Sequence, residues 1–410
     1  MTDHDEVTVA AGGAAQPAVR RFPFNVPPQL TAPAPDTYAD LRENDPVHRV
    51  ELPYGGQAWL VTRYADVRTV LADPRFSRTA ASRPEAPRFE PVPPPPVGVF
   101  VSDPPEHTRL RSLVATAFTR RRVEALRPGV RASVQALITR MEEAGPPTDL
   151  VTDFALPLPV AVICDLFGVP EGDRTRFRQW CDALLSTTSM TEEQIHSSRG
   201  QLFGYLSSLV AQRRRDPADD LLSGLVKAQV EDDRLTEEEL VVFSGGLLVA
   251  GYETSASQLA NFTCLLLRDP ERWKKLSAGA EQVETVVEEL LRYVPSLDIG
   301  GFTRVATEDI ELSGVLVRAG ETVVPVLGSA NRDASVFAEP HHLDLTRATN
   351  PHIAFGYGPH RCIGAQLARV ELQEAFTALP GAFPGLRIEA EPRWKTGTIM
   401  HGLASLPVSW

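Results

Sequence analysis

One ten-residue segment constrains this chain more than any other. It places a single cysteine among glycines, an aromatic ring and cationic or imidazole side chains, in the order Phe355, Gly356, Tyr357, Gly358, Pro359, His360, Arg361, Cys362, Ile363 and Gly364. Gly356 and Gly358 allow backbone angles and close approaches that a Cβ atom would block, so the loop can fold tightly with Cys362 at its tip. Apolar residues with helical spacing follow, and the N-terminal end of such a helix stabilises a thiolate. The segment therefore predicts a thiolate that is presented to a metal.

A second segment predicts one unusually long helix. Thr236 and Glu239 have the spacing of a capping box, and the apolar run after them continues to Leu267 before Asp269 and Pro270 begin another helix. About thirty residues at 1.5 Å each give a helix of about 45 Å, which is long enough to cross the whole protein.

The middle of this helix contains a sequence that disfavours regular helix. Gly251 weakens the helix, and the Thr254 hydroxyl can bond to the carbonyl of Ala250 four residues earlier. We therefore expect a local bend with room for a ligand.

Together, these two segments resemble the haem-binding loop and the oxygen-activating helix of the cytochrome P450 family, the haem-thiolate monooxygenases. The resemblance implies a mainly α-helical fold of triangular-prism shape, with small β-sheets and a long central helix over the haem. It covers residues 21–410 as a single domain, after a tail at residues 1–20 that we expect to be flexible. The implied cofactor is haem b, with Cys362 as the ligand of the iron. The other positions that the family's haem-contacting motifs imply are Ala250, Gly251, Phe355, Gly356, His360 and Gly364.

The same resemblance assigns chemistry to Glu253 and Thr254. Oxygen activation consumes protons, which requires a hydroxyl donor beside the oxygen and a carboxylate linked to water. Thr254 would be the donor and Glu253 the relay. Taken alone, each residue would be interpreted as an ordinary helix residue, and the role of Tyr252 between Gly251 and this pair stays open.

Further segments of the chain match two other features of the family: the contacts to the haem propionates and a buried ion pair. His107 and Arg111 lie at i and i+4 of a predicted helix, and with Arg304 and His360 they would bind the haem propionates, which need cationic or N–H partners when enclosed. A pair formed by Glu289 and Arg292 would hold the segment that leads to the cysteine loop. The family's third basic partner is usually an arginine where this chain has His342, which could still donate one hydrogen bond.

The resemblance places the pocket among mostly apolar residues, which suits a bulky apolar small molecule. They are Val99, Phe100, Phe243, Gly246, Leu247, Leu297, Ile299 and Met400. The expected activity is hydroxylation or epoxidation in natural-product biosynthesis. Oxidative coupling without oxygen insertion and a non-catalytic haem sensor or carrier stay open as alternatives.

Composition limits the partners and the location. The net charge of −12 argues against nucleic-acid binding, the four cysteines are too far apart for a disulfide framework, and no apolar stretch is long enough to span a bilayer. We expect a cytoplasmic monomer. Because no flavin- or iron–sulfur-binding region is visible, electrons would come from a ferredoxin and its reductase. The expected docking residues are Arg120, Arg121, Arg122 and Arg361.

Overall fold

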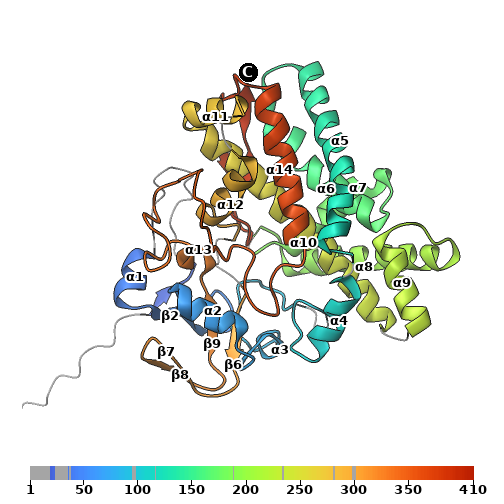
Figure 1. Ribbon diagram of the computed structural model, residues 1–410. Helices are drawn as coiled ribbons and strands as arrows, with labels where there is room; N and C mark the ends of the chain where they lie inside the picture. Colours follow the sequence, from blue (N-terminus) through green and yellow to red (C-terminus); the bar gives the residue numbers. More distant parts are fainter. Residues whose placement is uncertain are drawn as a thin grey trace, which may run out of the picture.

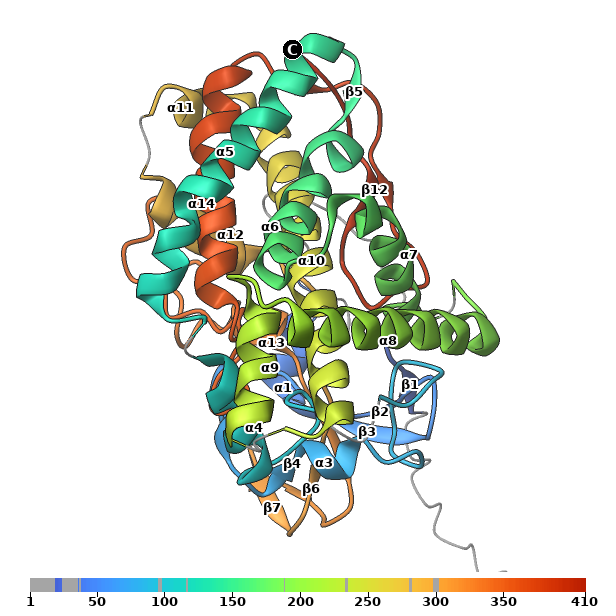
Figure 2. The same ribbon diagram turned by 90° about the vertical axis from the view of Figure 1, so that its right-hand side faces the viewer.

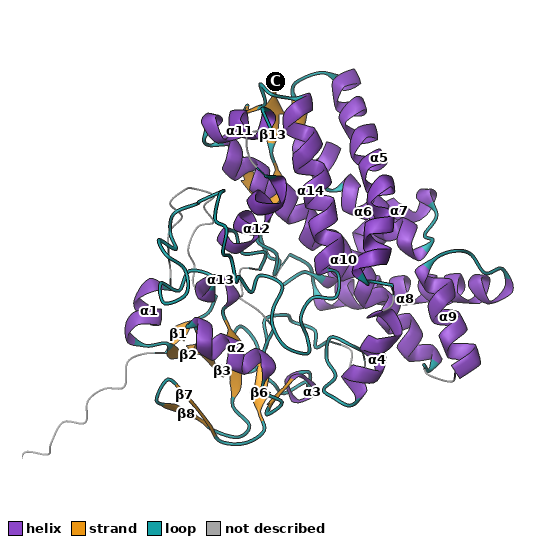
Figure 3. Cartoon of the chain, in the orientation of Figure 1, coloured by secondary structure: helices purple, strands orange, loops and turns teal. Residues whose placement is uncertain are grey.

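The computed structural model describes residues 19–23, 36, 38–94, 98–115, 117–187, 189–232, 235–279, 282–297 and 302–410. Residues 1–18 of the expected tail lie outside this range, and Arg20 already begins the first strand. The fold is mainly α-helical with small β-sheets, as expected, and the helices fill one side of the molecule while most strands gather on the other (Figures 1 and 3).

The helices contain about half of the described residues. They are α1 (Ala39–Asn44), α2 (Tyr64–Ala72), α3 (Arg78–Ala81), α4 (Glu106–Ala115), α5 (Arg120–Ala144), α6 (Pro157–Phe167), α7 (Arg174–Leu184), α8 (Glu192–Arg215), α9 (Leu221–Asp232), α10 (Glu237–Leu267), α11 (Pro270–Ser277), α12 (Val283–Tyr293), α13 (Leu327–Ala330) and α14 (Ala365–Ala382). A π-helical turn spans Val151–Ala155 and a 3₁₀ turn spans Glu171–Asp173.

The largest sheet has the strand order β1-β2-β3-β9-β6-β4. Its strands are β1 (Arg20–Arg21), β2 (Val47–Glu51), β3 (Gln57–Val61), β9 (Thr322–Pro325), β6 (Arg304–Ala306) and β4 (Phe76–Ser77). The pairing of β3 with β9 is parallel, with Ala58 opposite Thr322 and Val61 opposite Pro325. This pairing brings the N-terminal part of the chain beside the segment that follows α12.

Three smaller sheets complete the fold. One has the order β10 (Arg387–Ile388), β13 (Pro407–Ser409) and β5 (Thr148–Asp149). The other two are the hairpins of β7 (Ile310–Leu312) with β8 (Val315–Val317), and of β11 (Arg393–Trp394) with β12 (Leu403–Ser405).

Helix α10 is the centre of the helical half. It begins at the predicted capping box, in which Thr236 accepts from the Glu239 backbone and Glu239 accepts from the Thr236 backbone, and it runs for 31 residues, about 46 Å. From Ser255 to Leu267 every residue is buried, because α6, α8, α11 and α14 pack around it. Figure 2 shows α10 behind α6 and α8. No helix among the described residues is long and apolar enough to cross a membrane.

Candidate active site

The cysteine loop folds as a tight turn that glycines make possible. Gly356 and Gly358 have φ angles of +74° and +71°, and a Cβ atom at Gly358 would lie 2.6 Å from the Leu71 carbonyl oxygen of α2. The Cys362 amide donates to the Phe355 carbonyl at 2.8 Å, which closes the loop. Cys362 therefore stands three residues before the first residue of α14, with its side chain accessible.

The surroundings of the Cys362 thiol act on its pKa in opposite directions. Burial of the sulfur among protein atoms raises the pKa, whereas the Gly364 amide and the guanidinium of Arg111 lower it. The other three cysteines are buried, and burial raises the pKa of Cys164 to about 12. Cys362 is thus the cysteine, among the four, that combines access with cationic neighbours.

Two histidines meet beside this loop. His107 on α4 is 2% exposed, and its ring centroid lies 4.1 Å from that of His360. Within the described part of the chain, His107 Nε2 has no hydrogen-bond partner although it is buried. Burial and the guanidinium groups of Arg78 and Arg304 lower the pKa of His360 to about 2, so that its ring is neutral near pH 7.

Two buried arginines complete the cluster. Arg304 is 3% exposed and donates to the carbonyls of Phe302 and Thr303, and burial lowers its pKa. Arg78 is 7% exposed, donates to the Phe100 carbonyl at 2.8 Å, and lies 4.5 Å from the Phe302 ring centroid. Burial also lowers the pKa of Arg78, to about 10. Neither guanidinium forms an ion pair with a carboxylate of the described residues.

Arg111 on α4 joins this cationic cluster to the cysteine loop. Its Nη2 donates to the Arg361 carbonyl at 2.6 Å, and burial lowers its pKa. Buried positive charges without carboxylate partners are costly unless an anion neutralises them. The cationic cluster comprises Arg78, Arg111 and Arg304, which carry the charge, and His107 and His360, whose rings can donate N–H hydrogen bonds. Together with the accessible thiol, it fits a metal group that carries anionic side chains, as haem does.

The predicted contacts within α10 are present. Thr254 Oγ1 donates to the Ala250 carbonyl at 2.8 Å. Ala250 is exposed although the helix around it is largely buried. Every residue from Glu237 to Leu267 is α-helical, so the predicted long helix is continuous through Gly251 and Thr254. The back-bond of Thr254 is accommodated within a continuous α-helix.

Glu253 points away from bulk water and has several polar partners. It is 2% exposed, its Oε1 accepts from Ser257 Oγ at 2.8 Å, and the same oxygen forms an ion pair with Lys395. Its Oε2 has no partner among the described residues. The neighbouring Tyr252 is buried and donates to Asp182 of α7 at 2.7 Å, which ties α10 to α7.

The expected pocket residues fall into two groups. Phe100 packs against α10 so closely that a Cβ atom at Gly246 would lie 2.8 Å from its ring, and Val99 is buried beside it. Leu297 and Met400 form the second group and are joined by an isolated β-bridge. Phe243 and Leu247 are buried in the main helical core. Ile299 lies outside the described residues.

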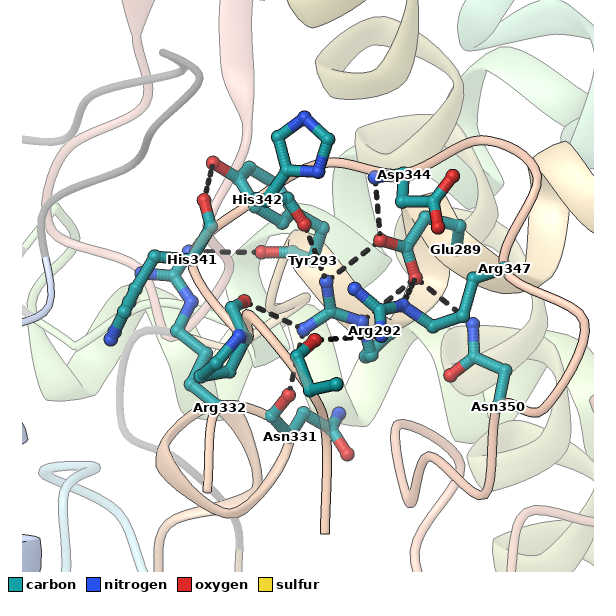
Figure 4. A network of polar contacts seen from close by, with 12 residues as sticks. Glu289, Arg292, Tyr293, Asn331, Arg332, His341, His342, Asp344, Arg347 and Asn350 are labelled. Atoms are coloured by element: carbon teal, nitrogen blue, oxygen red, sulfur yellow. Dashed lines mark hydrogen bonds and ion pairs between the residues drawn. The ribbon is translucent and has the colours of Figure 1, made fainter. Parts of the chain in front are cut away.

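The pair formed by Glu289 and Arg292 is the centre of a buried network (Figure 4). Both side chains are fully buried, and Arg292 Nη2 donates to Glu289 Oε1 at 2.7 Å. Arg292 also donates to the backbone carbonyls of Asn331 and Pro340. The network therefore fixes the segment between β9 and the cysteine loop to α12.

The third basic partner is Arg347 rather than His342. Arg347 Nε donates to Glu289 Oε2 at 3.0 Å, whereas His342 contributes only its backbone carbonyl, which accepts from Arg292 at 3.2 Å. The position that the resemblance implied for this partner is thus displaced by five residues. The arginine can take over because the turn after Asp344, whose amide donates to Glu289, brings Arg347 back toward α12.

The expected docking arginines lie at the start of α5 and in the loop before α14. Arg120, Arg121 and Arg122 form the exposed first turn of α5, and Arg361 is exposed in the cysteine loop. Figures 1 and 2 show α5 and α14 side by side, with both helices starting near the middle of the molecule.

Four residues of this region were not found by sequence reasoning. Arg347 could have been found, since it is the next arginine after the proline-containing motif. Arg78, Lys395 and the buried carboxyl of Glu371 on α14 carry no local signal, because only the packing shows that each is enclosed.

Comparison with known proteins decides the family. A family model described as "Cytochrome P450" matches residues 42–383. The chain belongs to the cytochrome P450 family. A nocardicin C N-oxygenase from Nocardia uniformis subsp. tsuyamanensis is 51% identical over 395 residues, which cover 95% of this chain and 98% of that protein. A mycinamicin IV hydroxylase/epoxidase from Micromonospora griseorubida is 46% identical, with the same coverage.

Solved structures agree with the P450 fold. The crystal structure of HinD with NMFT and NO has a TM-score of 0.91 and 50% identity, and the match covers 96% of this chain and all of that one. The structure of the mixed-function P450 MycG has a TM-score of 0.87 and 44% identity, with the same coverage. The protein is therefore a cytochrome P450 monooxygenase, and haem is its cofactor.

Proposed function

We propose that this P450 hydroxylates or epoxidises a bulky, mostly apolar small molecule in natural-product biosynthesis, with electrons from a ferredoxin and its reductase. The observation that carries the proposal is the pairing of two features: an accessible Cys362 beside the cationic cluster, and a Glu253–Thr254 pair on α10. A haem carrier would have no use for a proton-delivering pair.

The residues of the cysteine loop and the cationic cluster would hold the cofactor. Cys362 would supply the thiolate ligand of the iron, and His107, Arg111, Arg304 and His360 would bind the propionates, joined by Arg78. Phe355, Gly356 and Gly364 would shape the loop that holds this thiolate, while Ala250 and Gly251 of α10 would leave space for the cofactor. When bound, the haem supplies the reductive activation of dioxygen, which the thiolate assists by donating electron density.

Proton delivery would fall to α10. The Thr254 hydroxyl now donates to the Ala250 carbonyl, and turning away from it would free the hydroxyl for the oxygen site. Glu253 would take protons from water and pass them on, since its Oε2 is not engaged by any described residue.

The substrate class rests on the apolar lining and on the relatives. Val99, Phe100, Gly246, Leu247, Leu297 and Met400 are apolar, and Phe243 would extend the same surface. The named relatives act on nocardicin C and mycinamicin IV, and both names support a natural product as the substrate.

Oxidative coupling is a second candidate that specific neighbours favour. One solved structure with a TM-score of 0.88 and 40% identity is a cytochrome P450 described with biaryl coupling reactivity. Another, with a TM-score of 0.90 and 39% identity, is a putative thioether synthase.

Spectral titration of a natural-product library against the ferric protein tests the substrate class. Ligands that shift the Soret band are then incubated with NADPH, ferredoxin and ferredoxin reductase, and the product mass is measured. A gain of one oxygen atom supports monooxygenation, whereas a loss of two hydrogens with no oxygen gained would replace it by coupling. A library in which only small polar compounds bind would contradict the proposed substrate class.

The electron donor would dock at Arg120, Arg121, Arg122 and Arg361. The protein carries a net charge of −12, so an acidic ferredoxin needs a local patch of opposite sign, and that attraction is screened over about 8 Å at physiological salt. The exposure of these arginines, at the start of α5 and in the loop before α14, supports this site, because α5 and α14 pack side by side.

Replacing Arg121 and Arg122 by glutamate should slow reduction by ferredoxin severalfold and weaken its dependence on salt. Arg140 is a matched control because it is exposed on the same helix, about 28 Å further along. Peroxide-driven turnover needs no donor and should stay near wild type. Equal losses in both assays, or the same loss in Arg140→Glu, would contradict the docking site.

A cytoplasmic monomer is also proposed, and sedimentation of the purified protein checks the monomeric state.

A further inference from the structure

The buried carboxylate of Glu253 depends on a residue from a distant part of the chain. Glu253 is 2% exposed in the middle of α10, and the cation that neutralises it is Lys395, which follows β11 near the C-terminus. The side chain of Lys395 is 22% exposed, so the ion pair reaches from the core toward solvent. A buried carboxylate without such a partner would take up a proton or swing toward water.

The two oxygens of Glu253 are used differently. Oε1 accepts from both Lys395 and Ser257, while Oε2 has no partner among the described residues. The lysine therefore fixes the orientation of the carboxyl group through one oxygen and leaves the other available to water. A proton relay needs this division, because one atom must be held while the other exchanges protons.

Lys395 is itself held at the base of a loop that contacts α10. Its backbone amide donates to the Gly402 carbonyl at 2.9 Å, which closes residues 395–402 into the end of the β11–β12 hairpin. Gly402 abuts α10, since a Cβ atom there would lie 2.3 Å from Ser257 Oγ. Asn261 of α10 also donates to the His401 carbonyl at 2.6 Å. The hairpin thus has a defined position relative to the acidic residue.

The other side of the same loop reaches the expected substrate pocket. Met400 forms its β-bridge with Leu297, and the Ile399 amide donates to the Leu185 carbonyl. The loop therefore connects pocket-lining residues to the ion pair over a short span of chain.

We propose that Lys395 is a positioning residue for proton delivery, which holds Glu253 Oε1 from the substrate-facing C-terminal loop and leaves Oε2 to exchange protons with water. This inference rests on the proposed function. In each transfer Glu253 accepts one proton from water and passes one proton on, so that the carboxylate and its ion pair are restored.

The fate of dioxygen without any substrate tests the role of Lys395. Two electrons from NADPH and two protons reduce dioxygen to hydrogen peroxide, whereas four electrons and four protons reduce it to two waters. The fraction of electrons recovered as peroxide is measured with ferredoxin and ferredoxin reductase. Lys395→Met should raise this fraction severalfold and Glu253→Gln should do the same. Lys395→Arg should stay near wild type, as should Lys275→Met, which changes an exposed lysine of α11.

A second measurement is independent of turnover. Urea unfolding of the ferric protein is compared for Glu253→Gln, Lys395→Met and the double variant. Because the two side chains form one ion pair, the double variant should lose less stability than the sum of the single losses. Where Lys395→Met does not fold, Lys395→Gln replaces it in both measurements.

Several outcomes would overturn the proposal. An unchanged peroxide fraction in Lys395→Met would show that the lysine does not position the relay. The same conclusion would follow if the peroxide fraction rose as much in Lys395→Arg as in Lys395→Met. Additive losses in the unfolding experiment would show that the ion pair does not form. A wild-type protein that transfers no electrons from NADPH to dioxygen would instead contradict the proposed function, and the unfolding comparison would still decide whether the pair exists.

Discussion

His107 and His360 pack with their ring centroids 4.1 Å apart, and this contact joins α4 to the loop that carries Cys362. Burial lowers the pKa of His360, and the guanidinium groups of Arg78, Arg304 and Arg111 lower it further. Elements from separate parts of the chain therefore contribute positive charge to one place beside the thiol. An anionic cofactor would relieve this repulsion, so haem binding and the local stability of the cluster should depend on each other.

Arg78 tests this reasoning, because nothing in the sequence distinguishes it from a surface arginine. A hydrogen bond to a charged group contributes about 1.5–3 kcal/mol, so Arg78→Leu should accelerate haem loss to apomyoglobin by roughly ten- to a hundredfold. Arg78→Lys should lose less. Arg75→Leu is a matched control, since Arg75 lies three residues earlier, is exposed, and pairs with Asp73.

A different result for Arg78→Leu would contradict a role of Arg78 in haem binding. Its guanidinium also holds the Phe100 carbonyl. If Arg78→Leu lowers the melting temperature while the rate of haem loss stays at the wild-type value, the residue only anchors the loop before α4.

The network around Glu289 predicts unequal effects of two neighbouring substitutions. Arg347→Leu removes one charged partner of a fully buried carboxylate that keeps its pair with Arg292, and losing such a charge-assisted hydrogen bond costs about 1.5–3 kcal/mol. His342→Ala should cost far less, because only its backbone carbonyl takes part. Urea unfolding of the two variants measures the difference. Equal losses would mean that the side chain of His342 is the third basic partner after all.

Thr254→Ala separates proton delivery from haem and substrate binding. The variant should bind both, yet more of the electrons from NADPH should appear as hydrogen peroxide, because the hydroxyl donor is missing while electron transfer is intact. Product formed per NADPH consumed is the quantity to measure. An unchanged ratio would show that the hydroxyl serves only its bond to the Ala250 carbonyl.

Glu371 predicts a specific dependence of stability on pH. Burial raises its pKa from 4.5 to about 8, while hydrogen bonding to Ser255 of α10 acts against this rise. Between these values the folded state keeps the proton and the unfolded state releases it, so stability falls as pH rises, by about 1.4 kcal/mol per pH unit for this group. Below pH 4.5 the contribution to stability is fully present, and it is lost as pH rises to about 8.

Glu371→Gln removes this titration. The difference in free energy of unfolding between the variant and the wild type should therefore shift in favour of the variant from about pH 5 to about pH 8. A difference that is constant over this range would show that Glu371 does not hold its proton in the folded state.

Local patterns explain why much of the fold could be predicted. The capping box at Thr236 and Glu239 and the helix that begins at Asp269 and Pro270 each depend on neighbouring residues, and the structure contains both. The length of α10 was predicted for the same reason, since the capping box at its start and the Asp269–Pro270 signal after its end are both local.

Long-range contacts explain what could not be predicted. Lys395 lies 142 residues from Glu253, and Arg347 lies 58 residues from Glu289, so neither partner has a signal at short spacing. The motif after α12 indicated His342 because a fixed spacing was carried over from the family, whereas the actual partner depends on how the turn at Asp344 folds.

The ferrous carbon monoxide spectrum of Cys362→Ser tests the central claim most directly. With Cys362 as the axial thiolate, the wild-type protein shows the red-shifted Soret band of a thiolate-ligated haem, and Cys362→Ser should lose that band. Cys164→Ser is the matched control, because Cys164 is buried in α6, and it should keep the band. Retention of the red-shifted band in Cys362→Ser, or its loss in Cys164→Ser, would contradict the account.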